Sequence, residues 1–123
     1  MRATQLLAVI LLLSLGINAQ NLWNDVRDPG LEGRVINPSK SRILALDFDA
    51  VQSVLLSAPM EYTVGYSDSP VHLSMPMPNG EFETFAIVEA PVMAPELTAK
   101  FPSIRSFRGV SISRPGLTMR CDV

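Results

Sequence analysis

The Pro-Asn-Gly triplet at positions 78–80 constrains this fold more than any other feature, because it predicts a tight hairpin at a defined place. Asn and Gly tolerate the positive φ angles that such a turn requires. Val71 to Met77 alternates apolar and polar residues, as a strand with one buried face does. Phe82 to Val88 is apolar on both faces and is expected inside the sheet. Pro76 restricts the first strand to an edge or a bulge, since proline has no N–H to donate.

A short helix is expected before this hairpin. Val51, Val54 and Leu55 lie at helical spacing and predict a helix over Asp49–Ser57, which ends before Pro59.

The start of that helix has two candidate caps. Asp47 or Asp49 can accept a hydrogen bond from a free backbone N–H, which explains this carboxylate pair better than catalysis does. If Asp49 is the cap, Phe48 is placed to act as a hydrophobic staple.

A second helix and two more strands are expected after the hairpin. The helix spans Pro91–Phe101, with Pro95 in its first turn, Glu96 near its N-terminus and Lys100 near its C-terminus. The strands are expected at Ile104–Ser113 and Leu117–Val123, around a turn at 114–116.

These elements together predict an α+β fold with a mostly antiparallel β-sheet and two short helices. The final strand is still running at the last residue, so we expect one domain over 42–123 that is truncated at its C-terminus.

The N-terminus predicts export. Arg2 is followed by an apolar run from Leu6 to Leu15, which is shorter than the ~20 residues that span a bilayer. We therefore expect a signal peptide over 1–19, cleaved between Ala19 and Gln20, with Gly16 as the alternative site. Secretion through the Sec pathway follows, without stable membrane insertion after cleavage. A retained membrane anchor is the alternative.

Residues 20–41 are rich in Asn, Asp, Gly and Pro and are expected to form an extended leader. Trp23 and the pair Val35 and Ile36 are its apolar anchors, with room for one edge strand around Arg34 to Asn37.

Charge and cysteine content exclude several classes. The formal net charge of −2 offers no basic field for nucleic acid. Cys121 is the single cysteine, so no internal disulfide can staple the domain.

Catalytic groups are scarce. His72 is the single histidine, whereas a catalytic zinc site needs three ligands, so we expect no metal site and read His72 as a surface residue. Asp68, His72 and Ser74 form a triad only on paper, because geometry and not sequence proximity defines one. No serine lies in a nucleophile elbow. We predict no catalytic residue and no cofactor in this chain.

The remaining carboxylates have structural explanations. Glu81 and Glu83 are expected to line the solvent side of a hairpin arm. The group Asp25, Asp28 and Glu32 lacks the alternating ligand spacing of a calcium loop, so solvated charge is the preferred account.

The stretch Glu89–Ser113, EAPVMAPELTAKFPSIRSFRGVSIS, has an unusual order of residues. It resembles the pro-region of secreted bacterial reprolysin-like zinc metalloproteases, in which a phrase of the type E-x-P-V-M-x-P-E-L-x-x-K-x-P precedes the protease domain. The likeness is close from Phe82 to Gly109 and looser at Trp23, at 36–38 and at 58–59. The zinc-binding H-E-x-x-H motif is not in this sequence.

The resemblance implies a non-catalytic pro-region. Such a region helps the downstream protease domain of the same polypeptide to fold and holds it inactive, and zinc is expected in that domain. A free-standing secreted β-rich binding or adhesion module is the alternative, and an enzyme of another type is a third.

Cys121 has two interpretations. Several zinc proteases are inhibited by a pro-segment thiolate, and 120–123 is faintly similar to such a cysteine-switch phrase, although no proline precedes Arg120 and Asp122 replaces the glycine. Cys121 also lies on the apolar side of its predicted strand, where a free cysteine packs as a small hydrophobe. We prefer packing and keep the inhibitory zinc ligand as the alternative.

Overall fold

The computed structural model describes residues 22–27, 35–36 and 38–123. The expected signal peptide, with its cleavage site at Ala19 and Gln20, lies outside these residues. None of the helices in the described part of the chain has the length and apolar character that crossing a bilayer requires.

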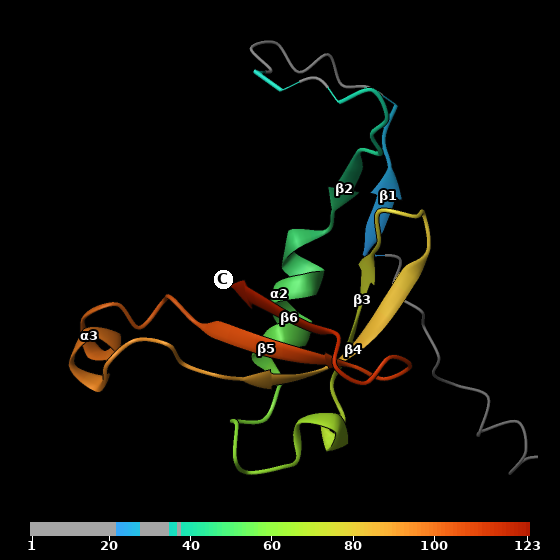
Figure 1. Ribbon diagram of the computed structural model, residues 1–123. Helices are drawn as coiled ribbons and strands as arrows, with labels where there is room; N and C mark the ends of the chain where they lie inside the picture. The colour runs from blue at the N-terminus through green and yellow to red at the C-terminus, as the bar shows by residue number, and fades with distance from the viewer. Residues whose placement is uncertain (1–21, 28–34, 37) are drawn as a thin grey trace, which may run out of the picture.

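The predicted α+β fold, mostly antiparallel, is confirmed (Figure 1). A two-stranded sheet pairs β1 with β2, and a four-stranded antiparallel sheet has the order β3-β4-β5-β6. The described elements are β1 (Trp23–Asp25), β2 (Leu44–Leu46), α2 (Phe48–Leu56), the 3-10 turn η1 (Tyr66–Asp68), β3 (His72–Pro76), β4 (Phe82–Glu89), α3 (Pro95–Lys100), β5 (Ser106–Ser111) and β6 (Thr118–Asp122).

The β3–β4 hairpin forms where the sequence predicts it. Gly80 has a φ of 90°, the left-handed conformation that glycine adopts without strain. The N–H of Met77 donates to the carbonyl of Glu81 at 2.8 Å and closes the turn. β3 is an edge strand, which is one of the two positions that Pro76 allows, and β4 lies between β3 and β5, as its apolar residues predict.

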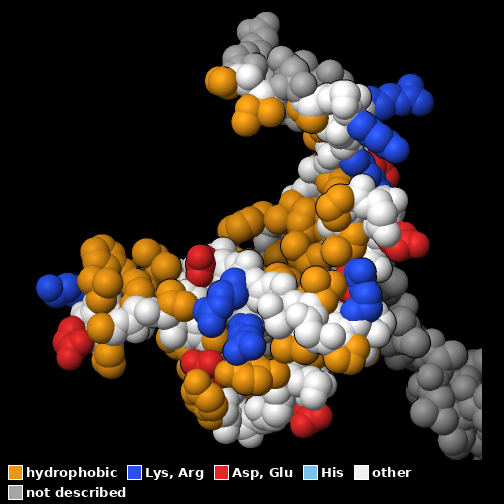
Figure 2. Space-filling model, in the orientation of Figure 1, with side chains coloured by type: hydrophobic (Ala, Val, Ile, Leu, Met, Phe, Trp, Pro, Cys, Tyr) orange, Lys and Arg blue, Asp and Glu red, His pale blue; other side chains and the backbone are white. Residues whose placement is uncertain are grey.

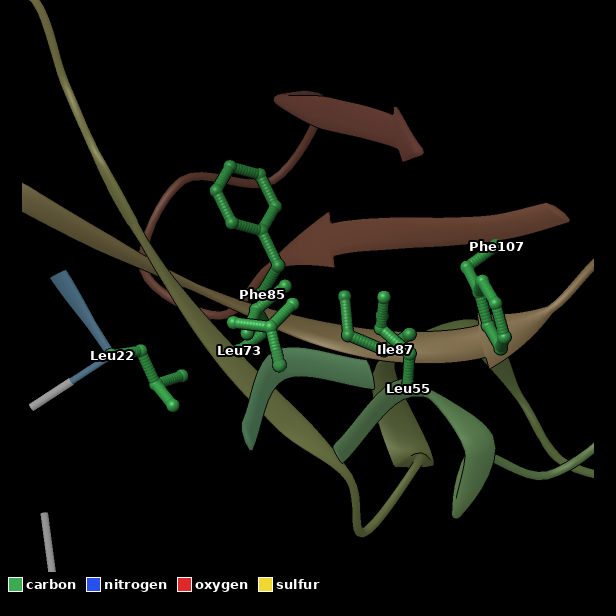
Figure 3. Close-up of a cluster of buried hydrophobic side chains, with 7 residues drawn as sticks. Leu22, Leu55, Leu73, Phe85, Ile87 and Phe107 are labelled. Carbon is green, nitrogen blue, oxygen red and sulfur yellow. The ribbon is translucent and has the colours of Figure 1, made fainter. Parts of the chain in front are cut away.

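The core lies between one face of this sheet and α2 (Figure 3). Burying each large apolar side chain stabilises the fold by about 1.5–3 kcal/mol. Leu22 belongs to this core and precedes β1, so the beginning of the segment expected as a leader packs on the domain. The buried cluster comprises Leu22, Val51, Leu55, Leu73, Phe85, Ile87 and Phe107.

Helix α2 begins one residue before the predicted Asp49, because Asp47 is the cap. The Asp47 carboxylate accepts a hydrogen bond from the N–H of Ala50 at 3.0 Å. Phe48 is therefore the first helical residue and is 53% exposed, so the staple that depended on an Asp49 cap does not form. Asp49 lies in the first turn, where its charge suits the helix dipole.

Helix α3 is shorter than the predicted Pro91–Phe101. Pro95 holds Ala94 in an extended conformation, with ψ at 148°, so the helix cannot start earlier. Glu96 and Lys100 take their expected places at its two ends. In Figure 1, α3 stands at the end of an arm that leaves the sheet.

Strands β5 and β6 form within the predicted ranges, around a turn in which Gly116 has a φ of 96°. Gly109 lets them lie close, because a Cβ there would come within 2.7 Å of Met119 Cγ and 2.8 Å of Ile87 Cδ1.

The edge strand expected around Arg34 to Asn37 is wrong for the two residues of it that the structure describes. Val35 and Ile36 belong to no strand and are 95% and 77% exposed. Strand β2 pairs instead with β1, whose residues precede this segment.

Candidate partner-binding surface

The two edges of the four-stranded sheet differ in their backbone hydrogen bonds. In an antiparallel pair, residues that exchange bonds with the neighbouring strand alternate with residues whose N–H and C=O point away. The carbonyl of Val71 accepts from Ile87 at 2.8 Å, and Met77 bonds to Glu81, so every second residue of β3 is turned toward β4. The outward backbone groups of β3 therefore belong to His72, Ser74 and Pro76.

This outer edge of β3 is protected. The indole Nε1 of Trp23 donates to the carbonyl of Ser74 at 2.8 Å, and Pro76 has no N–H. An incoming strand would therefore find the central acceptor occupied and one donor missing.

Among the described residues, no strand pairs with the outer edge of β6, which we call the open edge. Arg105 and Val123 exchange two hydrogen bonds of 2.9 Å, and the N–H of Ser111 donates to the carbonyl of Leu117 at 2.9 Å. The alternate residues of β6 therefore point their backbone groups away from β5, where no described strand pairs with them. These residues are Thr118, Arg120 and Asp122.

An apolar groove of about 140 Å³ runs beside this open edge. Figure 2 shows orange side chains gathered over α2, between β2 and the strand β6. Phe48 at the rim is 53% exposed and Leu46 is 38% exposed, so the groove lies open to solvent. Its walls come from β1, β2, α2, β3 and β6, and include Trp23, Leu46, Phe48, Met75, Met119 and Cys121.

Cys121 is half-buried and packs against the core, as the packing interpretation predicts. Burial, with a smaller contribution from the charge of Asp122, raises the pKa of its thiol. The thiolate that binds a metal is therefore disfavoured at neutral pH in the chain as it stands. Inhibitory zinc ligation by Cys121 stays a hypothesis.

Asp68, His72 and Ser74 do not form a catalytic triad in the structure. The hydroxyl of Ser74 pairs with that of Thr84 at 3.2 Å. Asp68 accepts a long contact of 3.5 Å from Ser67. His72 is exposed, and within the described chain no hydrogen bond joins it to Asp68 or Ser74.

The expectation that Glu83 lines the solvent side of the hairpin is wrong. Glu83 is buried, and its Oε1 accepts hydrogen bonds of 2.5 Å from the hydroxyls of Ser111 and Ser113. Arg114 Nε donates to its Oε2 at 2.8 Å. These bonds, led by the one from Ser111, lower the pKa of Glu83 to about 2. Glu81 is exposed, as expected, and bonds to Asn79.

Glu83 is buried, although the sequence predicted an exposed side chain, because the turn between β5 and β6 folds back over β4. The alternation in β4 alone cannot reveal a partner that lies about thirty residues further on. The group fastens that turn and offers no free acid for catalysis.

A second hollow, of about 330 Å³, lies where the arm bearing α3 leaves the sheet. Glu89 and Arg105 form an ion pair at its base, with Arg105 Nε donating to Oε1 at 2.8 Å. The N–H of Glu61 donates to the carbonyl of Glu89 at 2.8 Å. The ion pair joins the two ends of the arm to each other, and the backbone bond joins the loop after α2 to the end of β4.

Of the three carboxylates weighed for calcium, the structure describes only Asp25. Asp25 pairs with Arg42, whose Nε lies 2.7 Å from Oδ1, and this hydrogen bond lowers the pKa of Asp25. Asp28 and Glu32 lie outside the described residues. In the parts of the chain that the structure describes, no three His, Cys, Asp or Glu side chains are grouped to hold a metal ion.

Comparison with known proteins adds no identity, since no family model, curated protein or solved structure matches this chain. The open edge and the groove are therefore the features from which function can be argued. Sequence reasoning missed both, because the groove is assembled from five separate elements. Pro76 was the one signal that the two edges would differ.

Proposed function

We propose that this chain is the signal peptide and pro-region of a secreted reprolysin-like zinc metalloprotease. The pro-region helps the downstream catalytic domain to fold, inhibits it, and does no chemistry itself. The observation that carries this proposal is the open edge of β6 beside an apolar groove, since this surface suits a polypeptide partner. The resemblance of Glu89–Ser113 supplies the identity of that partner.

The chemistry of the surface favours a protein over a small molecule. The groove is about 140 Å³, below the range of about 300–1,000 Å³ of most small-molecule sites. Its lining is apolar apart from Asp122. A protease domain that covers it would stabilise the pair by mass action, because only the folded pro-region offers the site.

The stretch that carries the resemblance has a structural part in this proposal. It includes the end of β4, the arm with α3, and β5, and the Glu89–Arg105 pair fastens its two ends. Leu97 and Phe101 on the arm are 44% and 48% exposed. The arm therefore provides a second apolar contact for a large partner, which a single small ligand could not use.

The direct test adds the purified chain to the metalloprotease domain encoded after Val123 and measures cleavage of a peptide substrate. Phe48→Asp places a charge at the groove rim and is expected to weaken inhibition at least tenfold. Tyr62→Asp is the matched control, because Tyr62 is 85% exposed and does not line the groove. Cleavage rates that are the same with and without the chain would refute the inhibitory role.

The alternative is a free-standing secreted β-rich binding or adhesion module, which the same open surface would also serve. The codons that follow Val123 separate the two. A zinc-binding helix with three histidines supports the pro-region, and a stop codon supports the module.

A further inference from the structure

We propose that the open edge of β6 binds one extended segment of the partner polypeptide, which joins the sheet as a fifth, antiparallel strand. The identity of the partner rests on the proposed function, whereas the mode of binding rests on the geometry of this edge. The segment alternates apolar side chains, which fill the groove, with charged ones, of which a carboxylate faces Arg120.

The backbone of β6 sets the first requirement. Thr118, Arg120 and Asp122 present N–H and C=O groups to the open side, and an added strand satisfies them as β5 satisfies the others. The opposite edge cannot serve, because Trp23 occupies the carbonyl of Ser74. The sheet can therefore grow on one side only.

The groove sets the second requirement. Met119 and Cys121 point to the face that α2 covers, where they line the groove with Phe48. Residues of an added strand that lie opposite Met119 and Cys121 place their side chains on this same face. A volume of about 140 Å³ suits a few aliphatic side chains.

Charge sets the third requirement. On the face of the sheet away from α2, Arg120 in β6 lies directly opposite Arg108 in β5, and like charges in such a cross-strand pair are unfavourable. Blue side chains gather over β5 and β6 in Figure 2. Arg108 stacks on Tyr66 at 4.4 Å, whereas no described carboxylate forms an ion pair with Arg120. A carboxylate opposite Arg120 and an ammonium group opposite Asp122 would balance this face.

These requirements define a six-residue probe. In the antiparallel sense it reads VKVEVT, and a fluorescent label allows binding to the purified chain to be followed by anisotropy. Its residues lie in turn opposite Val123, Asp122, Cys121, Arg120, Met119 and Thr118.

Two peptides with the same side chains test the pairing. The charge-exchanged peptide VEVKVT is expected to bind about tenfold more weakly, because both cross-strand pairs become repulsive. The double variant Arg120→Glu and Asp122→Lys should reverse this preference. Both positions are exposed, and circular dichroism checks that the variant is folded.

Backbone methylation tests the hydrogen bonds. An N-methyl group on the glutamate of VKVEVT removes an N–H that faces β6 and should abolish binding. An N-methyl group on the central valine faces away and should change affinity less than threefold.

Three results would overturn the proposal. The first is equal affinity of the chain for VKVEVT and VEVKVT. The second is an equal loss of affinity from the two N-methyl groups. The third is a homodimer in sedimentation that the peptide does not dissociate and that diamide crosslinks through Cys121. The last result would assign the edge to a second copy of this chain.

Failure of this inference is distinguishable from failure of the proposed function. If the Arg120→Glu, Asp122→Lys variant still inhibits the protease and the original chain does not bind the peptide, the proposed function stands and this mode of binding is refuted. Peptide binding without protease inhibition does the reverse.

Discussion

The two edges of one sheet are treated differently in this molecule. β3 carries a proline and has its outward carbonyl at Ser74 capped by Trp23, whereas β6 presents three residues with outward backbone groups beside an apolar groove. Unprotected edges invite other strands, so proteins commonly block them. On β3 the block combines a local proline with a hydrogen bond from Trp23, which lies in a distant segment. Where that contact is missing, the edge is a candidate for binding.

The largest effect is expected from removing the cap on β3. Trp23→Ala deletes the indole that packs against the core and frees the carbonyl of Ser74, which should lower the free energy of unfolding by about 2–4 kcal/mol. Trp23→Phe keeps a ring and should cost about 1 kcal/mol through the lost hydrogen bond. Urea denaturation measures both.

The same substitution makes the two edges alike. Light scattering should show more self-association for Trp23→Ala than for Trp23→Phe, because the exposed β3 edge can then pair. Equal light scattering from the two variants would show that a ring at position 23 does not protect this edge.

The next effect concerns the attachment of the open edge. Gly109→Ala places a methyl group against Met119 Cγ and Ile87 Cδ1 and should destabilise the protein by about 1–3 kcal/mol. Hydrogen exchange should accelerate in β6 more than in β3. Met119→Ala in the same chain makes room and should recover part of the loss, so strictly additive effects in this double-mutant cycle would contradict the packing argument.

Acid should loosen the turn that leads into β6. The pKa of Glu83 is lowered from 4.5 to about 2, so its stabilisation is complete above pH 4.5 and is lost as the pH falls toward 2. Urea denaturation at several pH values follows this loss. Glu83→Gln should lack that part of the pH dependence, whereas Glu81→Gln, on the exposed side of the hairpin, should retain it. Identical profiles for Glu83→Gln and the original chain would count against the role of Glu83.

The smallest effect is expected at Cys121. Burial and the charge of Asp122 raise the pKa of this thiol, so iodoacetamide should alkylate it more slowly at pH 8 than it alkylates the urea-unfolded chain. Bound VKVEVT should slow the reaction further, because it covers the groove. A folded-state rate equal to the unfolded rate would show that the β6 side is not packed as described.

The proposed pro-region function rests on a resemblance in sequence and on a surface that suits a polypeptide. What the structure adds is a place on the molecule where that proposal can be tested with single substitutions.

Local chemistry in the sequence was sufficient for the α+β class, the hairpin at 78–80, the position of β4 inside the sheet and the restriction of β3 to an edge or a bulge. These features follow from backbone preferences and side-chain alternation, which act between near neighbours in the chain. Tertiary structure alone decided that Trp23 caps β3, that Glu83 is buried and that β6 borders a groove. Each of these depends on contacts between residues far apart in sequence, and local patterns carry no information about which distant group arrives.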